Sequence, residues 1–187
     1  PRKYPHYAAQ VIRDQVDKML KARIIRVSQS SFAAPVITVR KPDGSYRLVV
    51  DYRSLNEACE LDAYPLPTID ELVRYLGGAR IFSTWDLAAG YYQCPLENPE
   101  LAAFRTPYGL FEPLVVFLGL KSAPGHFQRC MNSIFADMLY KTVLSYLDDA
   151  CLYTATVEEH ITVLEEAFSR LRWRRLKLHP DKCRFFA

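Results

Sequence analysis

Two adjacent carboxylates stand between two apolar segments in the stretch TVLSYLDDACLYT, residues 142–154. Both flanks are rich in β-branched, aromatic and aliphatic residues, which favours two strands joined by a turn. Because Asp is common in turns, a plain hairpin turn is the simpler interpretation. The flanks are so apolar, however, that we expect the hairpin to be largely buried, and adjacent unpaired carboxylates repel each other and are costly to bury. The stretch therefore predicts a cation at Asp148 and Asp149.

A third carboxylate, Asp86, ends another apolar segment at about 80–86. Three carboxylates brought together from two strand regions would form a hard oxygen site of the kind that Mg²⁺ prefers. Two such ions can activate a terminal hydroxyl, orient a triphosphate and stabilise a leaving pyrophosphate. These residues therefore indicate nucleotide polymerase chemistry, although an aromatic-x-Asp-Asp tetrapeptide alone is only suggestive.

The rest of the chain mixes helices with hairpins. Apolar spacing predicts helices at about 6–22, 69–76, 123–138 and 157–175. Capping boxes, Thr68 with Glu71 and Thr156 with Glu159, mark the start of the second and the fourth helix. Hairpins are predicted with strands at 36–41 and 46–50 around a Pro-Asp-Gly-Ser turn at 42–45, and at 102–106 and 114–118 around 107–109. Antiparallel hairpins combined with long helices predict an α+β fold.

Composition and charge limit the class of protein. The 187 residues are 50% hydrophobic and 24% charged, which indicates one large globular domain or two small lobes and excludes a disordered or collagen-like chain. The net charge is +7 over residues 1–50, −6 over 51–120 and +2 over 121–187. This division fits ordinary solvated surfaces, or a lobe that binds a polyanion beside a carboxylate site that binds cations.

Cysteine usage and hydropathy argue against several other classes. The five cysteines are widely spaced and form no C-x-x-C pair, which disfavours a disulfide framework or a zinc ribbon. His179 and Cys183 alone cannot close a tetrahedral metal site. The N-terminus is basic and polar, and no apolar run approaches the ~18 residues that span a bilayer. We therefore expect a soluble protein of a reducing compartment, with no membrane partner.

Several motifs together resemble those of reverse transcriptases. Tyr146-Leu147-Asp148-Asp149 matches the Y-x-D-D motif, and Asp86-Leu87-x-x-Gly90-Tyr91-x-Gln93 matches the preceding catalytic motif of gypsy-type long-terminal-repeat retrotransposons. Further stretches agree in the same order, at 24–30, 41–47, 50–56, 103–109, 123–128 and 182–186. The resemblance covers nearly the whole chain.

The resemblance implies a right-hand polymerase fold without a thumb. It places fingers at 1–60 and 94–121 and a palm, an antiparallel sheet packed on helices, at 61–93 and 122–187. The implied activity is that of an RNA-directed and DNA-directed DNA polymerase, which adds deoxynucleotides to a primer 3′ end with two Mg²⁺ ions, for which Mn²⁺ can substitute. Implied partners are an RNA or DNA template with its primer, deoxynucleoside triphosphates, and the thumb, connection and ribonuclease H of a polyprotein. The implied location is the cytoplasm, within retrotransposon particles.

The resemblance also implies roles for single residues. Catalysis and metal binding are assigned to Asp86, Asp148 and Asp149. Nucleotide binding is assigned to Arg47, Lys41, Leu87, Tyr91 and Leu118. In this group Arg47 grips the triphosphate, Lys41 is a weaker second, and Tyr91 lies under the sugar and excludes a 2′-hydroxyl. Template and primer contacts are assigned to Asn56, Gln128 and Tyr146.

One departure keeps alternatives open. Val116-Phe117-Leu118-Gly119-Leu120 stands where gypsy-type enzymes usually read Met-Pro-Phe-Gly-Leu, in a loop that lies against the incoming base in the family. A degenerate or co-opted copy that binds nucleic acid without catalysis is therefore the chief alternative. An RNA-directed RNA polymerase would share the palm carboxylates, but Tyr91 as a sugar gate disfavours it. Because the resemblance stops before the thumb, we expect weak template-primer affinity and poor processivity from this chain alone.

Overall fold

The computed structural model describes residues 4–42, 44, 46–60 and 62–187. The chain forms two compact units, Pro1–Leu61 with Cys94–Ala123, and Asp62–Gln93 with Pro124–Ala187. Each unit thus consists of two separate stretches of sequence. The names fingers and palm for these units remain a prediction.

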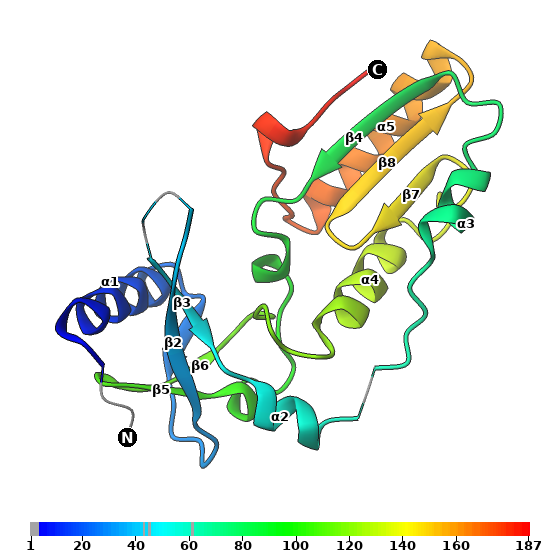
Figure 1. Ribbon diagram of the computed structural model, residues 1–187. Helices are drawn as coiled ribbons and strands as arrows, with labels where there is room; N and C mark the ends of the chain where they lie inside the picture. The colour runs from blue at the N-terminus through cyan, green and yellow to red at the C-terminus, as the bar shows by residue number, and fades with distance from the viewer. Residues whose placement is uncertain (1–3, 43, 45, 61) are drawn as a thin grey trace. The chain divides into compact units, whose positions relative to one another are not determined.

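The first unit contains a five-stranded sheet in the order β1-β6-β5-β2-β3. The strands are β1 (Ile25–Val27), β2 (Ala34–Arg40), β3 (Tyr46–Val50), β5 (Phe104–Thr106) and β6 (Gly109–Pro113). All neighbours are antiparallel except β2 and β5, which are parallel. The helices are α1 (His6–Lys21), α2 (Arg53–Ala58) and the 3₁₀ helix η2 (Pro99–Ala102). Ile12 and Val16 on α1 are buried, and α1 contacts β1, β2 and β3 (Figure 1).

The two hairpins predicted in this unit have different outcomes. The β2–β3 hairpin is confirmed, with Arg40 opposite Tyr46, although Asp43 and Ser45 of its expected turn lie outside the described residues. The hairpin predicted at 102–118 is wrong in its second strand, because β6 begins at Gly109 and not at 114. Thr106 pairs with Gly109, so the turn has only two residues. Gly109 has φ 141°, a conformation that glycine adopts without steric cost, and the strand can therefore start directly after the turn.

The second unit contains a three-stranded antiparallel sheet in the order β4-β8-β7. The strands are β4 (Ile81–Asp86), β7 (Val143–Tyr146) and β8 (Asp149–Thr154). The helices are α3 (Ile69–Arg74), α4 (Ala123–Ile134), α5 (Val157–Trp173) and the 3₁₀ helices η1 (Gly90–Gln93) and η3 (Pro180–Lys182). Figure 1 shows α5 behind β4 and β8. The mixed helix and antiparallel sheet confirm the α+β class.

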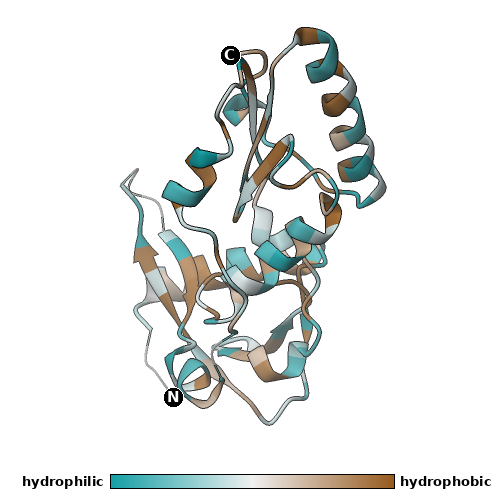
Figure 2. Ribbon diagram, turned by 90° about the vertical axis from the view of Figure 1, so that its right-hand side faces the viewer, coloured by the Kyte–Doolittle hydropathy of each residue, from teal (hydrophilic) through white to brown (hydrophobic). Residues whose placement is uncertain are grey.

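Hydrophobic packing holds the strands of the second unit against their helices. Trp85 on β4 is 1% exposed, and its ring lies 6.1 Å from Phe135 and 6.0 Å from Phe168 on α5. Truncating a buried aromatic of this size costs about 3–5 kcal/mol, so Trp85 is a main determinant of how β4 packs. Figure 2 shows hydrophobic residues along the strands, whereas α5 carries both hydrophobic and hydrophilic residues, as an amphipathic helix does.

The helix starts agree with the capping patterns in part. At α3 the full capping box is present, because Thr68 accepts from the Glu71 backbone and Glu71 accepts from the Thr68 backbone. At α5 the Thr156 hydroxyl accepts from the Glu159 backbone at 3.3 Å. None of the helices in the described part of the chain is both long and apolar enough to cross a membrane.

The C-terminal segment runs beside β4. The backbones of Thr84 and Arg184 exchange hydrogen bonds of 2.7 and 2.9 Å, and those of Phe82 and Ala187 exchange bonds of 3.0 and 2.9 Å. Beyond the end of β4, Leu87 pairs with Leu178. Residues 178–187 thus extend the edge of the sheet that β4 would otherwise leave open.

A buried histidine links α5 to this sheet. The His160 side chain is 0% exposed, and its ring nitrogens lie 2.7 Å from Ser83 Oγ and 2.8 Å from Thr154 Oγ1. Ser83 Oγ also accepts from the Phe186 backbone at 3.1 Å. Burial lowers the pKa of His160, a shift that the nearby Glu159 carboxylate partly opposes. The neutral ring is therefore the form that the fold stabilises.

We expect the free energy of unfolding to fall as the pH drops below about 6.5, the ordinary pKa of histidine. The unfolded chain binds a proton there more readily than the folded chain, so acid favours unfolding. Urea unfolding at pH 7.5 and 5.5 measures the change, with His160→Gln as the variant that cannot titrate. An equal loss of stability in wild type and His160→Gln would contradict this assignment.

Candidate active site

The two adjacent aspartates mark a tight turn between β7 and β8. Tyr146 and Asp149 pair across the turn, so Leu147 and Asp148 are its two central residues. Leu147 has φ 53°, a left-handed conformation that costs a residue with a side chain about 1–2 kcal/mol. Turns of this kind usually place glycine or asparagine there. Other contacts must therefore stabilise the strained turn.

Gln128 on α4 supplies these contacts. Its side chain is 0% exposed, and its Oε1 accepts a hydrogen bond from the Leu147 backbone at 2.7 Å. Its Nε2 donates to the Ser145 carbonyl at 3.0 Å and to Asn132 Oδ1 at 2.9 Å. One amide thus ties the end of β7 and the first residue of the turn to α4. The predicted contact of Gln128 with template or primer requires an accessible side chain, and this buried one is instead a positioning group.

A further polar network holds α4. Asn132 donates to the Tyr64 hydroxyl at 2.7 Å, and the Arg129 guanidinium lies 4.9 Å from the centre of the Tyr64 ring. Arg129 also bonds to Asp62 Oδ1 at 2.8 Å. A Cβ at Gly125 would lie 2.9 Å from Asp62 Oδ2, so any larger residue there would displace the Asp62 carboxylate. Sequence reasoning missed the network, although residues 125, 128, 129 and 132 share one face of a helix by their spacing.

The sheet brings the three candidate carboxylates to one end. Asp86 is directly opposite Asp149 across β4 and β8, and Asp148 is the next residue in the turn. The Leu87 backbone donates to the Asp148 carbonyl at 3.3 Å and so joins the end of β4 to the turn. The expectation of a buried tip is wrong, because Asp149 is exposed and Asp86 and Asp148 are only half-buried.

Asp149 is repelled by the neighbouring carboxylates Asp148 and Asp86, and this repulsion affects its pKa. Partial burial of its carboxyl, in a residue that is exposed as a whole, raises the pKa above the ordinary value, and the charges of Asp148 and Asp86 raise it further. The ammonium of Lys182 opposes this shift. Lys182 Nζ lies 3.1 Å from Asp86 Oδ2, with the lysine side chain 58% exposed and the aspartate 17% exposed. A lysine ammonium thus serves as the counter-ion of the carboxylate cluster.

The donor chemistry of this cluster fits a hard divalent cation. All the candidate ligands are carboxylate oxygens, which Mg²⁺ prefers, and a cationic group already lies against one of them. As the side chains stand, no three His, Cys, Asp or Glu residues within the described sequence are grouped closely enough to hold a metal ion.

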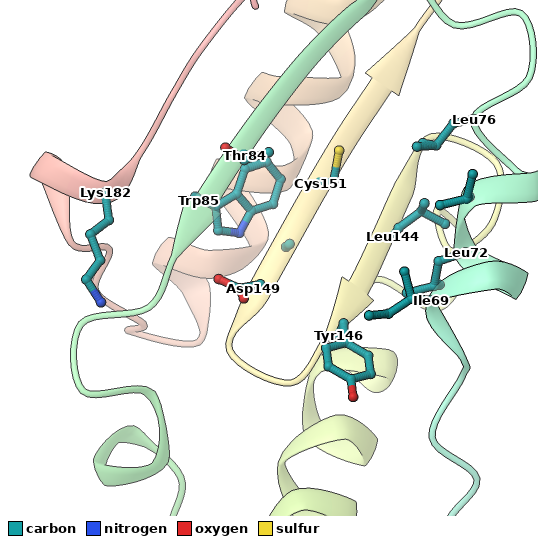
Figure 3. A pocket seen from close by; sticks show the side chains of 12 residues that line it. Ile69, Leu72, Leu76, Thr84, Trp85, Leu144, Tyr146, Asp149, Cys151 and Lys182 are labelled. Atoms are coloured by element: carbon teal, nitrogen blue, oxygen red, sulfur yellow. The ribbon is translucent and has the colours of Figure 1, made fainter.

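A cavity of about 320 Å³ adjoins the cluster within the second unit. Figure 3 shows side chains from α3 and from the sheet around it, with Asp149 and Lys182 from opposite sides of β4 at one part of the lining. Tyr146, assigned to template or primer contact, also lines it and is half-buried. The remaining lining residues are Ile69, Leu72, Val73, Leu76, Thr84, Trp85, Leu144, Ala150 and Cys151.

The nucleotide-binding candidates of this unit differ in exposure. Tyr91 is half-buried, its ring lies 5.1 Å from Phe127, and its pKa is raised by burial and then by the charge of Asp148. Preceding it, Gly90 has no room for a side chain, because a Cβ would lie 3.0 Å from that of Asp148. Leu87 is 1% exposed, so its side chain belongs to the core of this unit, and its role in nucleotide binding stays a prediction.

The remaining candidates belong to the first unit. Arg47 on β3, opposite Val39, and Lys41 beyond the end of β2 are both exposed. Leu118 is 61% exposed. The Asn56 amide donates to the Gly119 carbonyl at 2.7 Å and accepts from the Lys121 backbone at 2.8 Å. In this structure the Asn56 side chain thus holds the loop that follows Leu118. Its expected contact with the template or primer stays a prediction.

We predict that Gln128→Leu lowers the free energy of unfolding by about 2–4 kcal/mol, because it leaves the half-buried Leu147 N–H and the buried Ser145 carbonyl without these partners. Urea unfolding measures the effect. Gln15→Leu, the same change on the half-buried side of α1, is the control and should cost less than about 1 kcal/mol. Similar losses for the two variants would show that Gln128 does not support the turn.

Comparison with known proteins identifies the family. A family profile described as "Reverse transcriptase (RNA-dependent DNA polymerase)" matches residues 39–187. Over 181 residues the chain is 40% identical to the "Retrovirus-related Pol polyprotein from transposon 297" of Drosophila melanogaster, covering 93% of this chain and 17% of that protein. It is 34% identical over 178 residues to the "Transposon Tf2-3 polyprotein" of Schizosaccharomyces pombe, covering 94% and 13%.

Solved structures agree with this result. The crystal structure of prototype foamy virus protease-reverse transcriptase superposes with a TM-score of 0.82 at 26% identity, covering 99% of this chain and 25% of that one. The foamy viral protease-reverse transcriptase dRH in complex with double-stranded DNA gives a TM-score of 0.85 at 24% identity, covering 100% and 33%. The chain thus corresponds to a minor part of each relative. Since the family profile spans most of its length and a retrotransposon polyprotein is 40% identical to it, the chain belongs to the reverse transcriptase family.

Proposed function

We propose that this chain is the catalytic part of an RNA-directed and DNA-directed DNA polymerase that adds deoxynucleotides to a primer 3′ end by two-metal-ion transfer. The observation that carries the proposal is the register of β4 and β8, which sets Asp86 opposite Asp149 with Asp148 in the adjoining turn. Membership of the reverse transcriptase family supports the same chemistry. The proposal concerns this chain, which is 17% of the length of its Drosophila relative.

The three aspartates are the residues that would hold Mg²⁺. When bound, the ions lower the pKa of the primer hydroxyl and neutralise charge on the triphosphate. The protein's own contribution is placement, because the register and the Gln128 contacts keep Asp148 and Asp149 at the end of the sheet. Carboxylates held in advance need little reorganisation when charge develops during the reaction.

Tyr91 is proposed as the group that selects deoxynucleotides. Its ring packs on Phe127, and its pKa is raised by burial and then by the charge of Asp148. Gly90 lets this segment approach Asp148 closely. A rigid ring beside the reacting centre would collide with a 2′-hydroxyl on the incoming sugar. The selection is steric and therefore depends on the bulk of the side chain.

The first unit would bind the triphosphate and the strands. Arg47 and Lys41 are exposed, and a guanidinium can grip phosphate oxygens with two hydrogen bonds. Residues 1–50 carry a net charge of +7, which suits a polyanion. A template with its primer is the proposed partner, since a foamy viral relative is known in complex with double-stranded DNA. A thumb, connection and ribonuclease H would belong to the remainder of a polyprotein.

Primer extension on an RNA template tests the proposal. We expect incorporation of deoxynucleotides that requires Mg²⁺, and Asp148→Asn should reduce it at least about 100-fold because the turn loses a ligand. Glu165→Gln removes an exposed carboxylate on α5 and is the matched control, with activity near wild type. Incorporation that survives Asp148→Asn would refute the metal assignment.

One alternative keeps a specific observation in its favour. Leu118 is 61% exposed in the loop where the family usually has an aromatic residue, so a copy that binds nucleic acid without catalysis is the second candidate. Salt-sensitive RNA binding without incorporation, even when a thumb is supplied, would favour it.

Competition between ribonucleotides and deoxynucleotides tests the role of Tyr91. Wild type should prefer deoxynucleotides, and Tyr91→Ala should reduce that preference at least about tenfold, because removing the ring admits the 2′-hydroxyl. Tyr91→Phe keeps the ring and should behave like wild type. A preference for ribonucleotides by the wild type would indicate an RNA polymerase instead.

A further inference from the structure

The backbone around Lys182 is anchored on both sides. Before it, the His179 N–H donates to the Asp86 carbonyl at 2.9 Å, and after it, the Arg184 N–H donates to the Thr84 carbonyl at 2.9 Å. Between these two bonds the chain leaves the edge of β4 for the short turn η3. The turn ends at Lys182 and aims its side chain at Asp86. The position of the ammonium therefore follows from the pairing of the C-terminal segment with β4.

The side chain of Lys182 is less constrained than its backbone. Lys182 is 58% exposed, whereas the Asp86 carboxylate that it contacts is 17% exposed. Exposed ion pairs of this kind are weak, and the flexible lysine side chain can move into solvent at small cost. The contact is thus strong enough to orient the carboxylate and weak enough to be displaced.

We propose that Lys182 is the resident counter-ion of the carboxylate cluster, occupying Asp86 until a divalent cation displaces it. The proposal rests on the metal role assigned above to Asp86. In the described structure the Asp86 carboxylate is bound to the lysine at 3.1 Å, on a side chain that is only 17% exposed. Lys182 would keep the cluster from repelling itself before the metal arrives, and would raise the metal concentration needed to fill the site.

Divalent-cation binding to the purified chain tests this proposal without any measurement of catalysis. Free Mn²⁺ is followed by electron paramagnetic resonance as the chain is titrated. Wild type should bind Mn²⁺ at a site that Asp86→Asn weakens strongly. Lys182→Met keeps the length of the side chain but removes its charge, and should bind about fivefold more tightly, as the loss of a competing exposed ion pair predicts.

Two variants separate local displacement from a general change of charge. Lys182→Arg keeps the charge and should bind Mn²⁺ about as wild type does. Arg184→Met lowers the net charge by the same amount as Lys182→Met at an exposed residue of the same segment, and should change binding less than about twofold. Thermal unfolding of each variant confirms that the chain is folded.

The outcomes are distinct. Unchanged or weaker Mn²⁺ binding by Lys182→Met, or equal tightening by Arg184→Met, would overturn the role of Lys182 and leave the metal role of Asp86 intact. A wild-type chain whose Mn²⁺ binding does not respond to Asp86→Asn would overturn the metal assignment itself, and the role of Lys182 with it.

Discussion

The candidate active site depends on the register of the central strand of the second sheet. β8 pairs with β4 on one side and with β7 on the other, and Asp149 is opposite Asp86 and Tyr146 in the two pairs. Directly opposed residues of a sheet point to the same face. In β4 the buried residues Ser83 and Trp85 alternate with Thr84 and Asp86, so burial of Trp85 sends Asp86 to the other face. A slip of one residue would separate the two carboxylates.

Two flanking elements maintain this register. On the β7 side, Gln128 holds the strained turn through the Leu147 N–H, and the network from Asn132 through Tyr64 supports α4 behind it. On the β4 side, residues 178–187 pair with the free edge and bring Lys182 to Asp86. The site is therefore a sheet end held from both edges, in which Asp86 and Asp149 are positioned by backbone pairing and Asp148 by the tight turn between β7 and β8.

Much of this arrangement was predictable from local patterns. The apolar segments around Asp148-Asp149 predicted β7 and β8, and the segment ending at Asp86 predicted β4 with its correct end. Thr68 and Glu71 predicted the start of α3. These features depend on residues that are close together in the sequence, so local patterns are enough to predict them. The spacing of the aspartates alone only suggested a metal site. The resemblance to the family motifs is what assigned them a catalytic role.

Other features depend on contacts between distant parts of the chain. β1 has only three residues, too few to show alternation, and exists because it pairs with β6. The strand after Pro107 begins earlier than predicted, at Gly109 and not at 114, because the glycine lets the strand start directly after a two-residue turn. The family resemblance assigned Gln128 to the template or primer. A linear sequence does not show that this amide is buried, so its contacts with the turn could not be predicted. Lys182 lies 96 residues from its partner Asp86.

The most direct test of the account is a crystal structure of the chain with Mn²⁺, located by its anomalous scattering. The account predicts a Mn²⁺ ion bound to carboxylate oxygens of both Asp86 and Asp149, with the Lys182 ammonium moved away from Asp86. Mn²⁺ bound only elsewhere on the chain, with the Lys182 contact unchanged at saturating metal, would contradict it.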